Sequence, residues 1–186
     1  MAYTPTSVPP ICIKVAHEVI VALGNQPGTD VLPASLSRFM TAVCRKTGYR
    51  FSLIGHGRHR DVMSISRPEV PEGYGLVLKV GNKQSNMREI KLTLLHPDDW
   101  AKIYDAFDYG LVAEQVDMIR NLDDPRIKTP EFKARFEDLG TRYVGLTTQD
   151  FGFTKDGRIV IVGSSIRVLK VDAAMKGSAS QQIRTA

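Results

Sequence analysis

Apolar positions near the start of the chain recur at helical spacing in two segments. The run from Ile11 to Leu23 is mostly apolar, follows two prolines and is followed by Gly24. Proline before and glycine after such a segment are helix start and stop signals, so we expect a buried helix of about three turns. A second helix is predicted from Ala34 to Thr47, opened by Pro33 and stopped by Gly48. We expect these helices to brace a sheet; the alternative is a docking surface for a partner.

Short apolar runs bounded by turn residues predict a small antiparallel sheet after these helices. Strands are expected from Phe51 to Val62, from Leu76 to Val80, within the segment from Trp100 to Tyr109, and from Leu111 to Val116. A helix from Met87 to Leu95 is expected to pack against the sheet. Ser85 or Asn86 can cap its start, and Pro97 ends it.

The second half of the chain predicts two more helices and a hairpin. The helices are expected from Asp117 to Leu122 and from Pro130 to Leu139. The hairpin is expected from Phe151 to Val162, because the Asp156-Gly157 pair at its turn is a strong hairpin signal. The tail from Asp172 is polar and rich in small residues, which favours disorder. These elements together predict the α+β class.

Composition and charge place the chain among ordinary globular proteins. Its 186 residues are 42% hydrophobic and 24% charged, with a net charge of +5, which fits one domain or a small two-lobed one. No apolar run approaches the ~20 residues of a membrane helix, and the N-terminus lacks a secretory pattern. We therefore expect a cytoplasmic protein that keeps Cys12 and Cys44 as reduced core thiols. The mild positive charge permits a nucleic-acid partner without requiring one.

The candidate chemistry gathers around the predicted sheet. Gly55 and Gly57 follow an apolar strand, and glycines allow a backbone to approach phosphate groups closely. Lys79 lies inside an apolar strand, where a buried charged head needs an anion. Glu89 lies in the first turn of the next predicted helix, where the helix dipole favours a carboxylate.

These features resemble the nucleotide-binding lobe of the protein kinases, which has a glycine-rich loop, a Val-x-Lys strand and a glutamate on the following helix. The resemblance implies a kinase-like α+β fold that binds ATP. It also implies that Glu89 pairs with Lys79; the alternative is that Glu89 is only a carboxylate favoured by the helix dipole. The ATP contacts that it implies are Gly55, Gly57, Lys79 and Glu89, with the adenine bonded to backbone groups near Glu114 to Val116. It also implies a first lobe with an antiparallel sheet and one helix at 51–116 and a reduced second lobe with a hairpin at 117–171. The kinase pattern does not require the helical extension at residues 1–50 or the flexible tail at 172–186, which are expected from the local sequence.

Two registers compete within the second lobe. Asp150-Phe151-Gly152 matches the metal-binding motif of kinases, but no His-Arg-Asp loop precedes it. We prefer the register in which the predicted hairpin follows the catalytic loop. The kinase pattern then puts Asp150 at the metal-binding asparagine, Gly145 at the catalytic aspartate and Gly163 at the second metal-binding aspartate. Since glycine has no carboxylate, Asp150 is the one remaining candidate for a catalytic group or a magnesium ligand.

A basic cluster surrounds the glycine turn and consists of His56, Arg58, His59 and Arg60. It could contact phosphates of a nucleotide or of RNA, or an acidic protein surface; the alternative is a solvated basic loop. The four histidines and two cysteines of the chain show no zinc-ligand spacing.

Three functions are consistent with these residues. The first is a catalytically degenerate kinase-like protein of phage or bacterial-effector type, which binds a host or partner protein and inhibits or redirects it. The second is a minimal ATP-dependent Ser/Thr protein kinase that uses Lys79, Glu89 and Asp150. The third is a basic nucleic-acid-binding module without a nucleotide role.

Overall fold

The structure is a computed structural model that describes residues 10–24, 36–56, 60–66, 75–162 and 167–168. The chain divides into two units. The first holds Met1–Met118 and Phe151–Ser164, and the second holds Ile119–Asp150 and Ser165–Ala186. The predicted disordered tail from Asp172 lies outside the described residues, as do Gly57, Arg58, His59 and Gly163.

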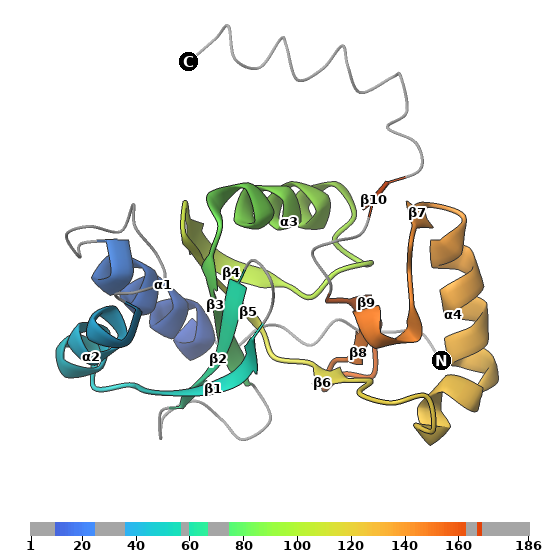
Figure 1. Ribbon diagram of the computed structural model, residues 1–186, viewed down its shortest axis with the longest axis horizontal. Coiled ribbons are helices and arrows are strands. Elements are labelled where there is room, and N and C mark those ends of the chain that lie inside the picture. The colour runs from blue at the N-terminus through green and yellow to red at the C-terminus, as the bar shows by residue number, and fades with distance from the viewer. Residues whose placement is uncertain (1–9, 25–35, 57–59, 67–74, 163–166, 169–186) are drawn as a thin grey trace, which may run out of the picture. The chain divides into compact units, whose positions relative to one another are not determined.

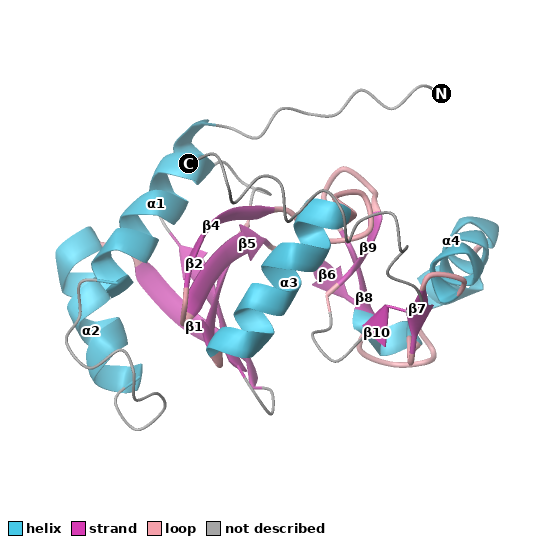
Figure 2. Ribbon diagram, turned by 90° about the horizontal axis from the view of Figure 1, so that it is seen from above, coloured by secondary structure: helices cyan, strands magenta, loops and turns pink. Residues whose placement is uncertain are grey.

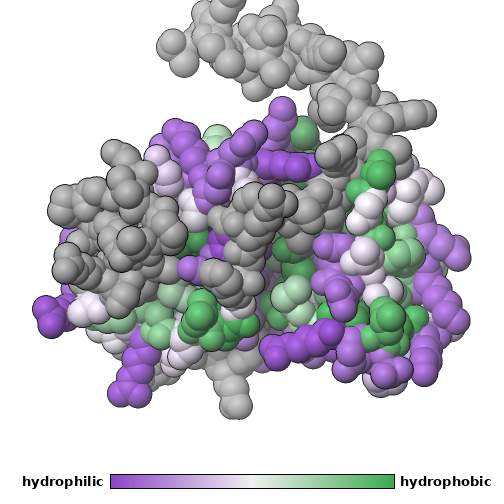
Figure 3. Space-filling model, in the orientation of Figure 1, coloured by the Kyte–Doolittle hydropathy of each residue, from purple (hydrophilic) through white to green (hydrophobic). Residues whose placement is uncertain are grey.

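A five-stranded antiparallel sheet forms the centre of the first unit (Figure 1). Its strands are β1 (Arg50–His56), β2 (Arg60–Ser66), β3 (Leu76–Gly81), β4 (Ile103–Phe107) and β5 (Gly110–Glu114). Their order is β1-β2-β3-β5-β4, so that β3 lies in the middle and β1 forms one edge. Leu53 and Ile54 of β1 are exposed. Figure 3 shows hydrophobic side chains interspersed with polar ones on the face of the molecule turned toward the viewer. The α+β class and the predicted antiparallel sheet are confirmed.

Helices cover both faces of this sheet (Figure 2). α1 (Pro10–Gly24) and α2 (Leu36–Thr47) lie on one face, and α3 (Lys83–Leu95) lies on the other. The prediction that the first two helices brace the sheet is confirmed, because they share an apolar core with it. They therefore belong to the same unit as the sheet.

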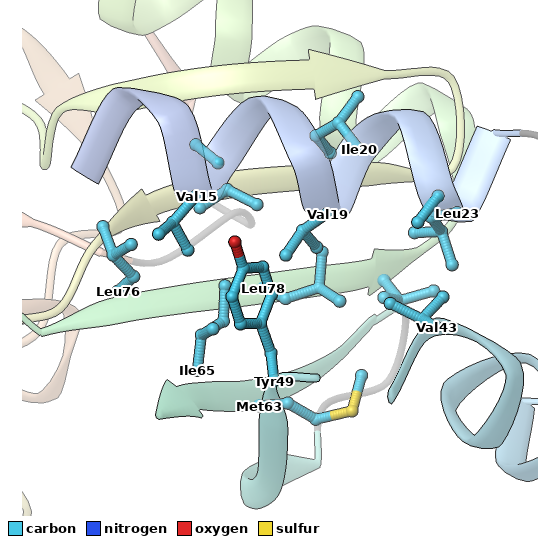
Figure 4. Packing of buried hydrophobic residues seen from close by; sticks show 14 of the residues in the cluster. Val15, Val19, Ile20, Leu23, Val43, Tyr49, Met63, Ile65, Leu76 and Leu78 are labelled. Carbon is cyan, nitrogen blue, oxygen red and sulfur yellow. The ribbon is translucent and has the colours of Figure 1, made fainter. Parts of the chain in front are cut away.

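The core beneath α1 is continuous and apolar (Figure 4). Val15 and Val19 of α1 pack over Leu78 of β3, together with Tyr49 and Met63, and all five residues are buried. Burying an apolar side chain of this size stabilises a protein by about 1.5–3 kcal/mol. Cys12 lies in the same core as a free thiol, where burial raises its pKa.

α3 begins four residues before the predicted start at Met87. The side chain of Asn82 caps it by accepting a hydrogen bond from the Gln84 N–H at 2.8 Å. Asn86, which the sequence suggested as a cap, is instead a buried residue inside the helix. Glu89 consequently lies in the second turn, so the alternative of a dipole-favoured carboxylate in the first turn is wrong.

A smaller sheet in the first unit contains the predicted hairpin. It consists of β6 (Asp117–Met118), β8 (Phe151–Phe153) and β9 (Ile159–Ile161), in the order β6-β8-β9. The hairpin prediction is confirmed, and Gly157 at its turn has a φ of +82°, which glycine adopts without strain. The helix predicted from Asp117 is wrong. Its first two residues pair with β8, and so short a segment has little helical stability to oppose that pairing.

The second unit is built around α4 (Pro130–Gly140), which confirms the helix predicted there. Its other elements are η1 (Pro125–Lys128), β7 (Tyr143–Val144), η2 (Thr148–Asp150) and β10 (Arg167–Val168), which pairs with β7. Thr129 caps α4 through its hydroxyl, which accepts from the Phe132 N–H at 3.2 Å. Asp124 caps η1 and bonds Arg126, and these bonds lower its pKa to about 2.

Candidate functional site

The candidate site is formed on the face of the sheet that α3 covers. Lys79 of β3 lies between Val62 of β2 and Leu111 of β5 in the strand register. Val62 and Leu111 belong to the apolar cluster that also contains Ile90 of α3. The side chain of Lys79 is only 8% exposed, so its ammonium group is held away from bulk water. A cation in this position needs an acidic partner close by.

Glu89 of α3 is that partner. Its Oε1 atom lies 2.5 Å from Lys79 Nζ, and its side chain is 2% exposed. The predicted ion pair between Lys79 and Glu89 is therefore confirmed. Because the two residues come from β3 and α3, the pair links the central strand of the sheet to its covering helix.

Arg60 is a second cation on the same carboxylate. Its Nη2 atom lies 2.6 Å from Glu89 Oε2, its Nη1 donates to Asn86 Oδ1 at 3.4 Å, and its side chain is 7% exposed. For Arg60, the alternative of a solvated basic loop is wrong, and a contact with phosphates or a partner stays a prediction. Arg60 starts β2 two residues before Val62, so both side chains lie on the face beneath α3. The alternation of Arg60 and Val62 was the signal in the sequence that could have located it.

The charges of this triad, Lys79, Glu89 and Arg60, do not cancel. Burial raises the pKa of the Glu89 carboxyl, but the two neighbouring cations and their hydrogen bonds outweigh burial and lower the pKa below its ordinary value. Glu89 is therefore ionised at neutral pH. With two cations and one carboxylate, the buried triad carries one excess positive charge.

Contacts at the start of α3 hold the helix in this position. Asn86 Nδ2 donates to the backbone oxygen of Asp108 at 3.3 Å, and Lys83 Nζ lies 2.5 Å from Asp108 Oδ2. Asp108 lies in the turn between β4 and β5, and Gly81 at the end of β3 donates to Tyr109 O at 2.9 Å in the same turn. Sequence reasoning missed the contact between Asn86 and Asp108, because it joins residues from separate elements.

The predicted glycine loop lies only partly within the described residues. Gly55 is in β1 opposite Val62, after a register shift that follows Leu53. A Cβ atom at Gly55 would meet Val62 Cβ at 3.7 Å, which is ordinary van der Waals contact, so this position does not require glycine for space. His56 ends β1. No side-chain position is described for it.

The segment predicted to contact adenine is strongly tied to the rest of the first unit. The backbone N–H of Glu114 donates to Lys102 O, and that of Gln115 donates to Gly75 O, both at 2.8 Å. The Glu114 carboxylate accepts from Arg158 Nη2 at 2.7 Å and so binds the hairpin. Two of the three N–H groups in this segment therefore already donate hydrogen bonds within the protein. A hydrogen bond from the Val116 N–H to an adenine base stays a prediction.

Val116 also explains Gly152. A Cβ atom at Gly152 would lie 2.7 Å from Val116 Cγ2, so the close approach of β8 to this segment requires glycine. Gly152 and Phe151 are both part of the hairpin strand β8. A packing role thus accounts for the glycine of the Asp150-Phe151-Gly152 sequence.

Asp150 belongs to the second unit. Its Oδ2 atom accepts hydrogen bonds from both the backbone N–H and the hydroxyl of Thr147, each at 2.8 Å. This carboxylate oxygen therefore stabilises the short turn from Thr147 to Asp150. Gly145 has a φ of +81°, a conformation that strains an aspartate or any other L residue. In the described part of the chain, no group of three or more His, Cys, Asp or Glu side chains is placed to hold a metal ion.

No protein-family model matches the chain, and no curated protein matches its sequence. None of the helices in the described ranges has the length and apolar character needed to cross a membrane.

Proposed function

We propose that this protein is a kinase-like binding protein that has lost phosphotransfer and acts by engaging a partner protein. The observation that carries the proposal is the buried triad of Lys79, Glu89 and Arg60, with its 2.5 Å and 2.6 Å ion pairs. A lysine on the third strand that pairs with a glutamate on the following helix resembles the phosphate-holding pair of protein kinases in residue type and chain order. The antiparallel sheet that bears the lysine supports the same resemblance.

The excess charge of the triad supports a site for an anion. Lys79 and Arg60 are both nearly buried, and Glu89 neutralises only one of them. A desolvated excess charge is stabilised when a counter-ion is bound. The phosphate chain of a nucleotide is an anion of the kind that such a lysine binds in kinases.

Arg60 also supports a degenerate site. Kinase loops follow the pattern Gly-x-Gly-x-x-Gly, and in this chain Gly55 and Gly57 are followed by Arg60 at the third position. A glycine there keeps the space over the phosphates free of side chains. The guanidinium group of Arg60 instead fills the space next to Glu89, and a nucleotide would have to share that space with it.

The second lobe lacks the carboxylates that phosphotransfer needs. In the preferred register, glycines stand at the catalytic and second metal-binding positions, and Gly145 has a backbone conformation suited to glycine. The Oδ2 atom of Asp150 accepts two hydrogen bonds from Thr147. Without these groups nothing in that register orients an attacking hydroxyl or holds magnesium, which typically costs orders of magnitude in rate.

The test combines a transfer assay with a binding assay. The protein is incubated with labelled ATP and magnesium, alone and with generic protein acceptors, and nucleotide binding is measured with and without magnesium. We expect no phosphotransfer above background and weak, metal-independent nucleotide binding that Lys79→Ala removes. Arg120→Ala, which removes an exposed cation of the second unit, is the matched control and should bind like the wild type.

The retained Lys79–Glu89 pair favours a second candidate, a minimal kinase. Its distinguishing result is magnesium-dependent phosphorylation of any acceptor that disappears in both Lys79→Ala and Asp150→Ala. That result would overturn the proposed loss of catalysis and make Asp150 the working carboxylate. Absence of both nucleotide binding and transfer, with intact folding, would overturn the nucleotide site itself.

A further inference from the structure

The two cations of the triad have hydrogen-bond donors that the described residues do not use. An ammonium group has three N–H donors, and a guanidinium group has five. Among the described residues, the Lys79 ammonium contacts only Glu89, and the Arg60 guanidinium contacts only Glu89 and Asn86. Both side chains are nearly buried, and a buried donor without an acceptor is costly. The remaining donors therefore indicate a further acceptor, which the excess positive charge of the triad makes an anion.

The strand register brings both cations within reach of one ligand. Arg60 of β2 lies opposite Gly81 of β3, two residues after Lys79, so the cations are diagonal neighbours on one face of the sheet. Their charged ends meet on the two oxygens of the Glu89 carboxylate, at 2.5 Å from Lys79 and 2.6 Å from Arg60. An anion with several phosphate groups can consequently contact both cations at once.

The triad does not fit a magnesium ion. In the kinase pattern, magnesium bridges the phosphates and neutralises their charge. Magnesium requires oxygen ligands, but Oε1 of Glu89 contacts Lys79 and Oε2 contacts Arg60. The Asp108 carboxylate near the start of α3 is paired with Lys83. The groups of the triad that have unused bonding capacity are therefore cationic N–H donors, which repel a metal ion.

Arg60 can supply the charge that magnesium would otherwise supply. A guanidinium group stays protonated in proteins, and its planar array of N–H groups suits the oxygens of a phosphate. A divalent cation on the same phosphate chain would be repelled by Arg60 and Lys79. Water screens such repulsion weakly where the side chains are nearly buried.

We propose that Arg60 takes the place of a metal ion, so that the triad binds a phosphate chain in its metal-free form and magnesium opposes binding. The inference rests on the proposed function, which makes the triad a phosphate site. It goes beyond that function, because the loss of catalysis requires only that binding does not need magnesium. The ligand is a polyphosphate anion, either a nucleoside triphosphate or a phosphate chain without a base.

The first measurement uses the wild-type full chain. Binding of labelled ATP is measured by equilibrium dialysis in EDTA and in magnesium in excess over the nucleotide. Sodium chloride brings the EDTA sample to the same ionic strength, because salt by itself weakens binding between charges. We expect ATP to bind at least about tenfold more tightly in EDTA than in magnesium. Calorimetry with tripolyphosphate under the same two conditions tests whether the phosphate chain is sufficient.

Two substitutions at Arg60 test its role. Arg60→Gln removes the charge but keeps a polar side chain, and it should weaken metal-free binding and abolish the difference between EDTA and magnesium. Arg60→Lys keeps the charge, so it should keep the preference for metal-free ATP. Arg120→Gln, at an exposed arginine of the second unit, is the matched control and should behave like the wild type. Circular dichroism checks that each variant is folded.

The outcomes separate this inference from the proposed function. Equal or tighter ATP binding by the wild type in magnesium would overturn the inference and leave the nucleotide site intact. A preference for metal-free ATP that persists in folded Arg60→Gln would overturn the role of Arg60. Metal-free binding of tripolyphosphate without binding of ATP would overturn only the nucleotide site. Absence of binding of either ligand in both conditions would overturn the inference and the nucleotide site together.

Discussion

The two faces of the five-stranded sheet are built on different principles. The face beneath α1 and α2 is filled by apolar side chains such as Val15, Val19 and Leu78, and it forms a continuous core. The face beneath α3 has a smaller apolar cluster around Val77 and Leu111 and, beside it, a buried triad of charged residues. Helices cover both faces, but the buried triad of charged residues lies only on the face beneath α3.

The apolar face suits a role in stability, whereas the charged face suits a role in function. Apolar burial stabilises a fold without strict geometry, whereas a buried ion pair offsets its desolvation cost only when every charge has a well-placed partner. A protein selected for stability alone has little reason to keep three charged groups beneath a helix. We therefore expect substitutions of the buried charges on the α3 face to affect both stability and nucleotide binding, and substitutions in the α1 core to affect stability alone. Four predictions test this contrast.

The largest effect is expected from Glu89→Ala. This change leaves Lys79 and Arg60 buried without a carboxylate, which typically costs about 3–5 kcal/mol of unfolding free energy. Urea unfolding followed by circular dichroism measures the loss. Glu137→Ala removes an exposed glutamate from α4 outside its first turn and should change stability by no more than about 0.5 kcal/mol. Equal losses in the two variants would contradict the structural role of the triad.

A loss of about 2–5 kcal/mol is expected from Leu78→Ala on the opposite face, because it opens a cavity in the α1 core. Unlike Glu89→Ala, it should leave nucleotide binding per folded molecule unchanged. Both properties can be measured on the same preparation. Leu53→Ala, at an exposed leucine on β1, serves as the control with little effect on stability. If Leu78→Ala abolished nucleotide binding while folded, the two faces would not be separable.

A pH dependence should distinguish the faces next. The folded pKa of Glu89 lies below its ordinary value of 4.5, so its stabilising contribution is fully present above pH 4.5 and is lost as pH falls through the folded pKa. The slope from this one group cannot exceed about 1.4 kcal/mol per pH unit. Urea midpoints from neutral pH downward should therefore fall less steeply for Glu89→Gln than for the wild type. Leu78→Ala is the control, and its urea midpoints should change with pH in parallel with those of the wild type. Identical slopes for Glu89→Gln and the wild type would contradict the predicted contribution of the Glu89 carboxylate.

The smallest effect is expected from Lys83→Ala. Lys83 pairs with Asp108 at 2.5 Å, a distance like those in the triad, but both side chains are about half exposed. Exposed pairs contribute little because water and salt screen them. We expect a urea midpoint close to that of the wild type. A loss as large as that of Glu89→Ala would show that burial is not what makes the triad important.

Much of the fold and part of the site could be predicted from local sequence. The apolar run of β3, the Asp-Gly turn of the hairpin and the proline-bounded helix α4 are local signals, and they led to correct elements. A lysine in an apolar strand indicated that an anion lies nearby, and the resemblance to kinases predicted that Glu89 supplies it, as the structure confirms. The sequence left open whether Arg60 contacts phosphates or a partner or lies in a solvated loop, because the partner of its guanidinium group depends on where α3 lies over β2.

By itself, the sequence determined the α+β class, the positions of most elements and the residue types that form the candidate site. Periodicity, turn residues and buried charge act within a few residues of one another, so they can be read along the chain. Tertiary structure alone decided that Asn82 caps α3, that Asp117 and Met118 pair with β8, and that Arg60 and Lys79 share Glu89. It also decided that α3 turns Met87 and Leu94 toward solvent. These features depend on contacts between distant segments, and such contacts override weak local preferences when they bury more surface or satisfy more charge.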